Sequence, residues 1–324
     1  MTAPRLPRWT PVRVSWADGE GSVDWCRTDG ERFDDPFFAQ TAERCLRHPA
    51  RLLFRRSTRL DDLAADATST ADEPSGFIFH LSRCGSTLVS QMLAALPSTF
   101  VISEAGPLDS VLRPPADVRA PAPDRRRAWL RAMVAALGRS RTGTHTQYVV
   151  KLDAWAAFQL GLVRAAFPSV PWLFLYRDPL EVLVSQLAQR GYHTMPGALS
   201  ADGLDIPPGE AMTMAPEDYC ARALAGICHA VLGGLDDQAL LVDYRQLPDA
   251  VHDRIAAHFG IRVTADDRRA MAEVATRDAK NPVLAFEPDG ATKRHRATPQ
   301  AVAAAEQWLR PPYEALEVAR GSRP

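Results

Sequence analysis

Residues 77–93 contain the feature that most restricts how this chain can fold. The apolar run at 77–81 (Phe-Ile-Phe-His-Leu) predicts a buried strand, residues 82–87 (Ser-Arg-Cys-Gly-Ser-Thr) form a tight turn around one glycine, and apolar residues then recur at helical spacing. In such a strand, loop and helix, backbone N–H groups of the loop and the positive end of the helix dipole face one concavity. The stretch therefore predicts an anion-binding loop.

Apolar runs and helical patterns alternate along the rest of the chain. Strands are predicted at 99–102, 147–151, 171–176 and 239–244, and helices at 88–96, 129–137, 154–166, 180–189, 219–232 and 247–259. This alternation is typical of an α/β protein with a phosphate-binding loop, in which a central parallel sheet lies between two layers of helices. Such sheets bind ligands beyond the carboxyl ends of their strands, so we expect four charged residues together there: Arg83, Glu104, Lys151 and Arg177.

The first 73 residues have a different pattern, and we place a domain boundary near residue 73. Alternating residues at 12–16 and 23–25 predict a β-hairpin, and residues 35–48 predict a helix. The run at 52–56 (Leu-Leu-Phe-Arg-Arg) predicts a strand, before a polar linker at 61–74. We therefore expect residues 1–73 to form a small β-rich appendage and residues 74–324 to form the main domain.

Charge and cysteine content exclude several classes of protein. With 38 Lys+Arg against 39 Asp+Glu the net charge is −1, so no overall field attracts nucleic acid or an anionic membrane. The five cysteines are odd in number and contain no C-x-x-C pair, which argues against a disulfide framework and against a zinc site. No apolar run approaches the roughly 20 residues of a membrane span, and the first residues lack the apolar core of a signal peptide. We expect a cytoplasmic protein that binds neither nucleic acid nor membrane.

The loop at 82–87 is not of the nucleotide-triphosphatase type, because Ser86 follows Gly85 where that motif has lysine. Residues 83–88 (Arg-Cys-Gly-Ser-Thr-Leu) instead resemble the Arg-Ser-Gly-Thr-Thr-Leu loop of sulfotransferases, which use 3′-phosphoadenosine-5′-phosphosulfate (PAPS). Residues 176–185 are similar to a second sulfotransferase motif, in which Arg-Asp-Pro is followed by a helix with a serine eight residues after the arginine. The resemblance implies these cofactor contacts: Arg83, Cys84, Gly85, Ser86 and Thr87 for the 5′-phosphosulfate end, and Arg177 and Ser185 for the 3′-phosphate.

The motif spacing agrees best with the tyrosylprotein-sulfotransferase branch and with bacterial sulfotransferases, over residues 77–250. Residues 151–153 (Lys-Leu-Asp) resemble the Lys-Asp-Pro of that branch, and Glu104 falls where the branch has its catalytic glutamate. Residues 242–247 resemble its Arg-Tyr-Glu-Gln-Leu, which implies a cofactor contact for Tyr244.

The chain departs from that branch in its phosphate ligands. Gln189 stands where the branch has a further 3′-phosphate arginine, and the adjacent Arg190 is the candidate substitute. Lys293 is a candidate phosphate ligand in segment 281–298, which we expect to be irregular. Segment 191–218 is rich in Gly and Pro, and loops of this length usually act as lids or substrate loops, or else are disordered.

Sulfuryl transfer requires an anion cradle, positive charge near the moving group and the leaving phosphate, and a base for the acceptor proton. The loop amides would supply the cradle, and Arg83 and Lys151 the positive charge, so that no metal is needed. Glu104 is the predicted base, and we expect partial burial to raise its pKa against the opposing effect of nearby cations. Rival bases are His80, His145, His193 and Asp109.

The resemblance therefore predicts a PAPS-dependent sulfotransferase that acts on a hydroxyl or amine of a soluble small molecule and releases 3′,5′-adenosine bisphosphate (PAP). An ATP-dependent phosphotransferase is an alternative, because loops of this kind also bind ATP. A non-catalytic nucleotide-binding module is another. The missing Gly-Lys-Ser/Thr and the presence of Arg177 with Ser185 favour the sulfotransferase. The pattern specifies neither the acceptor nor the oligomeric state.

Overall fold

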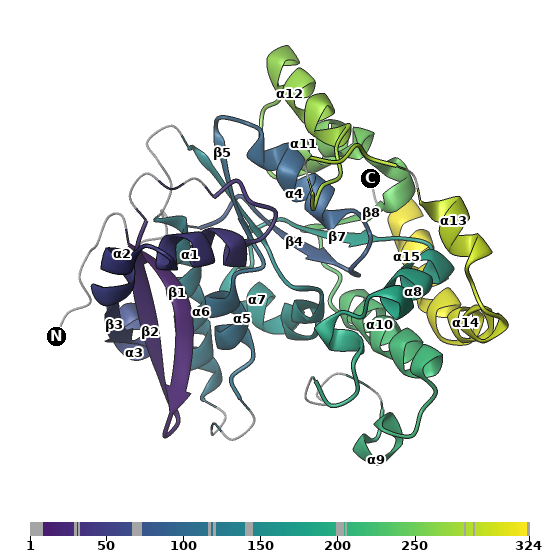
Figure 1. Cartoon of the computed structure of the whole chain (residues 1–324), viewed down its shortest axis with the longest axis horizontal. Helices are drawn as coiled ribbons and strands as arrows, with labels where there is room; N and C mark the ends of the chain where they lie inside the picture. Colours follow the sequence, from purple (N-terminus) through teal and green to yellow (C-terminus); the bar gives the residue numbers. More distant parts are fainter. Residues whose placement is uncertain are drawn as a thin grey trace.

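A five-stranded parallel sheet forms the centre of the protein in the computed structural model (Figure 1). The structure describes residues 9–28, 31, 33–66, 73–115, 118, 121–139, 145–198, 204, 206–281, 283–287 and 289–322. The strands are β4 (Gly76–His80), β5 (Thr99–Ser103), β6 (Gln147–Lys151), β7 (Trp172–Tyr176) and β8 (Ala239–Asp243), in the order β5-β6-β4-β7-β8. All neighbouring strands are parallel, with Ile78 beside Lys151 and His80 beside Leu175. The α/β class predicted from the sequence is confirmed.

Helices bury both faces of this sheet, as the alternation along β4 shows. Phe77 and Phe79 belong to one hydrophobic cluster, and Ile78 between them belongs to another. Because successive side chains of a strand point to opposite faces, one cluster lies on each side of the sheet. The predicted arrangement of helix layer, sheet and helix layer is therefore also confirmed.

The helices divide between the two faces. One face packs against α4 (Ser86–Ala94), the π-helical turn Val251–Ile255, α11 (Ala256–His258) and α12 (Ala265–Ala275). The other packs against α5 (Gly106–Leu112), α6 (Pro123–Gly138), α7 (Leu160–Ala166), α8 (Pro179–Ala188), α10 (Pro216–Gly233), α14 (Pro299–Ala304), the π-helical turn Ala305–Leu309 and α15 (Arg310–Gly321). Connections contain α9 (Pro208–Ala211), α13 (Gly290–His295) and the 3₁₀ turns Ala154–Gln159, Tyr192–Thr194 and Tyr244–Gln246.

Strand β4 lies where the chain changes direction across the sheet. From β4 the chain passes to β5 and β6 on one side, and then crosses to β7 and β8 on the other. In open parallel sheets, ligands bind beyond the strand ends at such a switch point. The loop that follows His80 and leads into α4 occupies this position.

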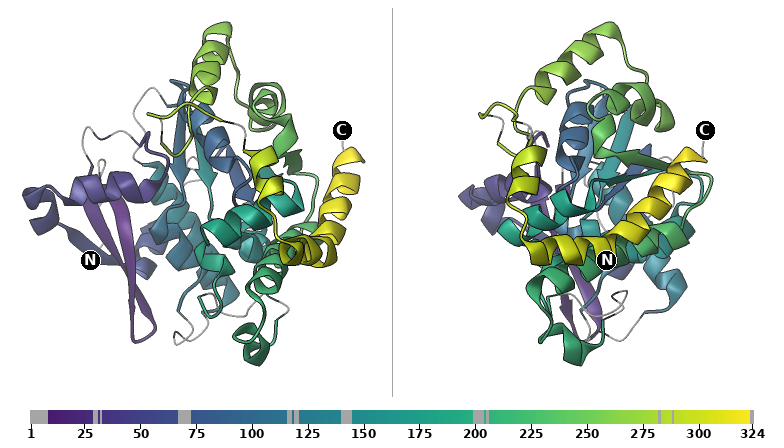
Figure 2. Two further views of the ribbon diagram at one scale, coloured as in Figure 1. Left: turned by 45° about the vertical axis from the view of Figure 1, so that its right-hand side comes forward. Right: turned by 90° about the vertical axis from the view of Figure 1, so that its right-hand side faces the viewer.

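A second, antiparallel sheet lies beside the main layers (Figures 1 and 2). It consists of β1 (Trp9–Ala17), β2 (Glu20–Arg27) and β3 (Arg56–Arg59), accompanied by α1 (Phe38–Leu46), α2 (Pro49–Leu53) and α3 (Leu60–Asp66). Trp25 and Phe38 belong to the same hydrophobic cluster as Phe77 of β4, and the Trp16 ring lies 5.6 Å from that of Trp129 in α6. The predicted β-hairpin is present, and a separate domain over residues 1–73 stays a prediction.

The predicted strand at 52–56 is wrong. Pro49–Leu53 form a short helix, and the strand begins only at Arg56. The apolar run is not buried, because Leu53 is 78% and Phe54 is 73% exposed. An apolar run predicts a buried strand only if the tertiary fold covers it.

The two segments predicted as irregular contain some regular structure. In 281–298, Gly290–His295 form α13. In 191–218, residues 199–203 and 205 lie outside the described residues, and the remainder includes Tyr192–Thr194 and α9. Across the described part of the chain, no helix is long and apolar enough to span a membrane.

Candidate functional site

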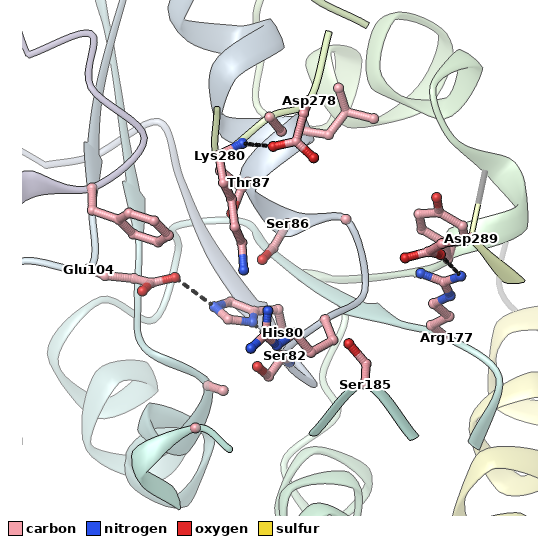
Figure 3. A pocket seen from close by; sticks show the side chains of 18 of the residues that line it. His80, Ser82, Ser86, Thr87, Glu104, Arg177, Ser185, Asp278, Lys280 and Asp289 are labelled. Atoms are coloured by element: carbon pink, nitrogen blue, oxygen red, sulfur yellow. Dashed lines mark hydrogen bonds and ion pairs between the residues drawn. The ribbon is translucent and has the colours of Figure 1, made fainter. Parts of the chain in front are cut away.

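A cavity of about 430 Å³ lies at the carboxyl edge of the parallel sheet (Figure 3). Each of the five strands contributes a residue from just beyond its end: Gly85 after β4, Glu104 after β5, Asp153 after β6, Arg177 after β7 and Tyr244 after β8. Parallel strands whose carboxyl ends share one edge thus bring together residues that are far apart in the sequence.

The backbone of the loop between β4 and α4 has left-handed φ angles at Ser82, Arg83 and Gly85, with values of 67°, 52° and 84°. Gly85 is the N-cap of α4. A Cβ at Gly85 would lie 2.7 Å from Leu247 Cδ1 and 2.9 Å from Tyr244 Cδ2. The position therefore requires glycine both for its φ angle and for the space.

The loop also presents backbone N–H groups to the cavity. Within the described residues, the backbone N–H groups of Gly85, Ser86 and Thr87 donate to no backbone carbonyl. All three residues line the cavity. N–H groups without a carbonyl acceptor at the N-terminus of a helix, where the dipole is positive, are suited to bind an anion.

Side chains on both sides hold this loop in place. The thiol of Cys84 is buried and donates to the Leu175 carbonyl at 3.2 Å. Arg83 donates to the backbone carbonyl and to the side-chain oxygen of Gln189, at 2.8 and 2.9 Å. The glutamine that replaces the expected arginine thus orients the loop arginine.

Glu104 forms an ion pair at the base of the loop. Its Oε1 lies 2.7 Å from Nζ of Lys151, which is fully buried and also lies 3.3 Å from Thr87 Oγ1. The φ of Glu104 is 54°, a left-handed value that costs a non-glycine residue about 1–3 kcal/mol and is typical of functional sites. Lys151 does not itself line the cavity, but its charge acts on residues that do, such as Asp153 and Lys280.

The electrostatics of Glu104 differ from the expectation. Burial favours the neutral carboxyl, but attraction to Lys151 and the contact with His80 outweigh it and hold the pKa of Glu104 below its usual range. The raised pKa expected from the sequence is therefore wrong. An ionised carboxylate with so low a pKa is a weak base.

His80 faces this ion pair from β4. Its Nδ1 accepts the Ser82 N–H at 3.0 Å, so the hydrogen of the neutral imidazole is on Nε2, 3.4 Å from Glu104 Oε1. Burial, together with the charge of Lys151, holds the pKa of His80 below its usual range. A neutral His80 directs its N–H towards Glu104 and has no free nitrogen for a substrate proton.

The other rival bases are also poorly suited to take a proton. His193 lines the cavity, but burial lowers its pKa to about 3. The Asp109 carboxylate accepts hydrogen bonds from Arg113, at 2.7 and 3.0 Å, and from Trp155 Nε1, at 2.7 Å. His145 packs on Phe100 and does not line the cavity.

A second cationic site lies at Arg177. Its Nε donates to Glu181 Oε2 at 2.7 Å, its Nη2 donates to Asp289 Oδ1 at 2.8 Å, and its guanidinium lies 4.0 Å from the centre of the Tyr244 ring. The side chain is 6% exposed. Ser185, two helical turns further along α8, lines the cavity as the resemblance requires.

Lys293 reaches the same site from α13. Its Nζ lies 2.8 Å from Asp289 Oδ2, so Asp289 bridges Lys293 and Arg177. Figure 3 shows Glu104 and His80 on one side of Ser86, and Arg177 with Asp289 on the other. The cavity therefore has two ends, which we call the Glu104 end and the Arg177 end.

Several residues at the cavity were not singled out from the sequence. Asp153 belongs to the 151–153 motif, which assigns it no role of its own, and Asp289 and Lys280 lie in a stretch without a motif. The Lys280 side chain points into the cavity near Ser86 (Figure 3). Arg190, the predicted substitute for a phosphate arginine, does not line the cavity.

Comparison with known proteins gives only distant structural similarity. No family model and no curated protein matches the chain. A sulfotransferase from Alicyclobacillus acidocaldarius is similar over 68% of this chain and 99% of its own, with 14% identity and a TM-score of 0.38. A sulfotransferase domain from the curacin biosynthetic pathway is similar over 72% of this chain and 96% of its own, with 14% identity and a TM-score of 0.41. A sulfotransferase from Mycobacterium avium is similar over 71% of this chain and 76% of its own, with 12% identity and a TM-score of 0.39. Likeness at this level carries no argument about the reaction.

Proposed function

We propose that this chain is a sulfotransferase that moves a sulfuryl group from PAPS to a hydroxyl or amine of a small molecule. The observation that supports the proposal is that the loop N–H groups with Arg83 and the polar groups of the Arg177 end line one cavity. The loop N–H groups and Arg83 form one site, and Arg177, Ser185 and Lys293 form the other. A nucleotide with phosphate groups at both its 5′ and 3′ positions matches such a pair.

In this proposal the chain's residues have distinct roles. The loop from Cys84 to Thr87 and Arg83 hold the 5′-phosphosulfate, and Tyr244 and Arg177 contact the nucleotide at its other end. The acceptor oxygen or nitrogen attacks sulfur, the bond from sulfur to the 5′-phosphate oxygen breaks, and the leaving phosphate remains in the loop. Cations and N–H groups fixed around the leaving phosphate stabilise the charge that develops there.

The cofactor class can be tested by isothermal titration calorimetry with PAP, 5′-AMP, and ATP with Mg²⁺. We expect PAP to bind in preference to the other two. Arg177→Ala should weaken the binding of PAP by about 10- to 100-fold, because a hydrogen bond to a charged group contributes about 1.5–3 kcal/mol to affinity. The same substitution should leave 5′-AMP nearly unchanged, since 5′-AMP lacks the 3′-phosphate.

Arg164→Ala is the matched control. Arg164 is 12% exposed and pairs with Asp236 at 2.7 Å, but it does not line the cavity. Its loss should reduce stability without changing the preference for PAP. Binding of ATP with Mg²⁺ but not of PAP would reject the sulfotransferase in favour of a phosphotransferase.

A further inference from the structure

Three carboxyl groups lie near the Glu104 end of the cavity, and two of them are engaged. Glu104 is paired with Lys151. Asp109 is held by Arg113 and Trp155, as described above. For Asp153, no hydrogen bond or ion pair of the side chain is found within the described residues, although its charge interacts with those of its neighbours.

The local backbone explains why the Asp153 carboxyl is not used to cap the turn that follows it. Asp153 follows β6 by two residues and precedes the 3₁₀ turn Ala154–Gln159. Its φ and ψ are −64° and 153°, and its side chain does not cap the turn. The backbone carbonyl of Asp153 accepts the Ala156 N–H at 2.9 Å instead. The turn is thus closed by the main chain, and the carboxyl is left to line the cavity.

Aromatic rings surround this end of the cavity. Trp155 lies two residues after Asp153, with its ring centroid 5.9 Å from that of Tyr192. The Phe37 ring centroid lies 5.4 Å from Nζ of Lys151, the partner of Glu104. All three aromatic residues line the cavity. Flat apolar walls beside a free carboxyl suit an aromatic molecule that carries a hydroxyl group.

We propose that Asp153, rather than Glu104, takes the proton of the acceptor, and that the acceptor is an aromatic alcohol or phenol bound between Phe37, Trp155 and Tyr192. This inference rests on the sulfotransferase function proposed above. As the acceptor oxygen forms its bond to sulfur, its proton passes to an Asp153 carboxylate oxygen. The bond from sulfur to the 5′-phosphate breaks, and its electron pair leaves with PAP.

The charges around Asp153 favour this role. Burial raises the pKa of Asp153 well above the usual carboxyl range, and the negative charges of Glu104 and Asp109 raise it further, while Lys151 and Arg113 oppose them. A carboxylate with a raised pKa is a stronger base than one with a lowered pKa. Because the folded state disfavours its ionised form, this carboxylate also destabilises the protein at pH values above its pKa.

The test compares Asp153→Asn with the unchanged chain, using PAPS and 2-naphthol as substrates and chromatography of 2-naphthyl sulfate as the readout. We expect kcat to fall at least about 100-fold, as for loss of a general base, with PAP affinity by calorimetry unchanged. Thermal unfolding at pH 8 should show a higher Tm, because a neutral amide replaces an unpaired carboxylate. A purely structural aspartate would give a lower Tm.

The pH profile gives a second readout. In the unchanged chain kcat should fall as the pH drops through the raised pKa of Asp153, and this decline should be absent from the residual rate of Asp153→Asn. Asp153→Glu should recover part of the rate. Asp249→Asn, on a side chain that is 84% exposed, is the control and should match the unchanged chain.

Two results would overturn the inference. The first is an unchanged rate of 2-naphthol sulfonation in Asp153→Asn. The second is that the unchanged chain binds PAP but does not turn over 2-naphthol, which would refute the acceptor site and leave the cofactor site standing. Absence of PAP binding by the unchanged chain would reject the proposed function itself, and Asp153 with it.

Discussion

Gly85→Ala tests whether the loop conformation is as demanding as its geometry indicates. Gly85 has a φ of 84°, and an added Cβ would lie 2.7 Å from Leu247 Cδ1 and 2.9 Å from Tyr244 Cδ2. The left-handed φ costs an alanine about 1–3 kcal/mol. The Leu247 methyl can move aside, but the Tyr244 ring is held by its stacking with Arg177.

The two costs add to a measurable loss of stability. Overpacking against a held side chain typically costs about 1–3 kcal/mol, so the total is roughly 2–6 kcal/mol. For a chain of this size, roughly 2 °C of Tm corresponds to 1 kcal/mol. Thermal unfolding followed by circular dichroism should therefore show a Tm that is about 4–12 °C lower. Displacement of the Tyr244 ring should also weaken PAP binding in the calorimetric assay.

Gly161→Ala provides the matched control. Gly161 lies in α7, its φ is not in the left-handed region, and an added Cβ meets nothing within 4 Å. Alanine in a helix is favoured over glycine by about 0.5–1 kcal/mol, so this variant should be as stable as the unchanged chain or slightly more stable. A Gly85→Ala variant with the Tm and PAP affinity of Gly161→Ala would refute the reasoning about the loop.

Two further predictions concern charges at the cavity ends. Asp289→Asn should strengthen PAP binding by up to about fivefold in calorimetry, because this half-exposed carboxylate competes with the 3′-phosphate for Arg177 and Lys293. The size of the effect follows from exposed ion pairs, which contribute up to about 1 kcal/mol. Weaker binding would show that Asp289 orients Arg177 instead. Glu104→Gln should lower the free energy of unfolding at pH 7 by about 3–5 kcal/mol, because it leaves the buried Lys151 unpaired. Because the pKa of Glu104 is lower in the folded than in the unfolded chain, its contribution to stability is present above the unfolded pKa and is lost as the pH falls through the folded pKa. The Tm of Glu104→Gln should therefore depend less on pH below about 4.5 than the Tm of the unchanged chain. Parallel curves of Tm against pH for the two proteins would contradict this.

The sequence predicted the parts of the site that depend on local pattern. The apolar run before the loop, the glycine and the helical spacing after it are properties of neighbouring residues, and β4, the turn and α4 follow them. The alternation of strands and helices likewise placed Arg83, Glu104 and Arg177 at one edge, because parallel strands end together. The apolar run at 52–56 failed as a strand because exposure depends on what the rest of the fold covers.

The sequence by itself determined the parallel sheet, the loop between β4 and α4, and the identity of the residues just beyond each strand. Only the tertiary structure decided how those residues are charged and paired. The 2.7 Å contact between Glu104 and Lys151 lowers the pKa of the predicted base, whereas the side chain of Asp153 has no hydrogen bond or ion pair among the described residues. Asp289 and Lys280 reach the cavity from a segment with no recognisable pattern. Pairing and pKa depend on distance and burial in three dimensions, which no local periodicity encodes.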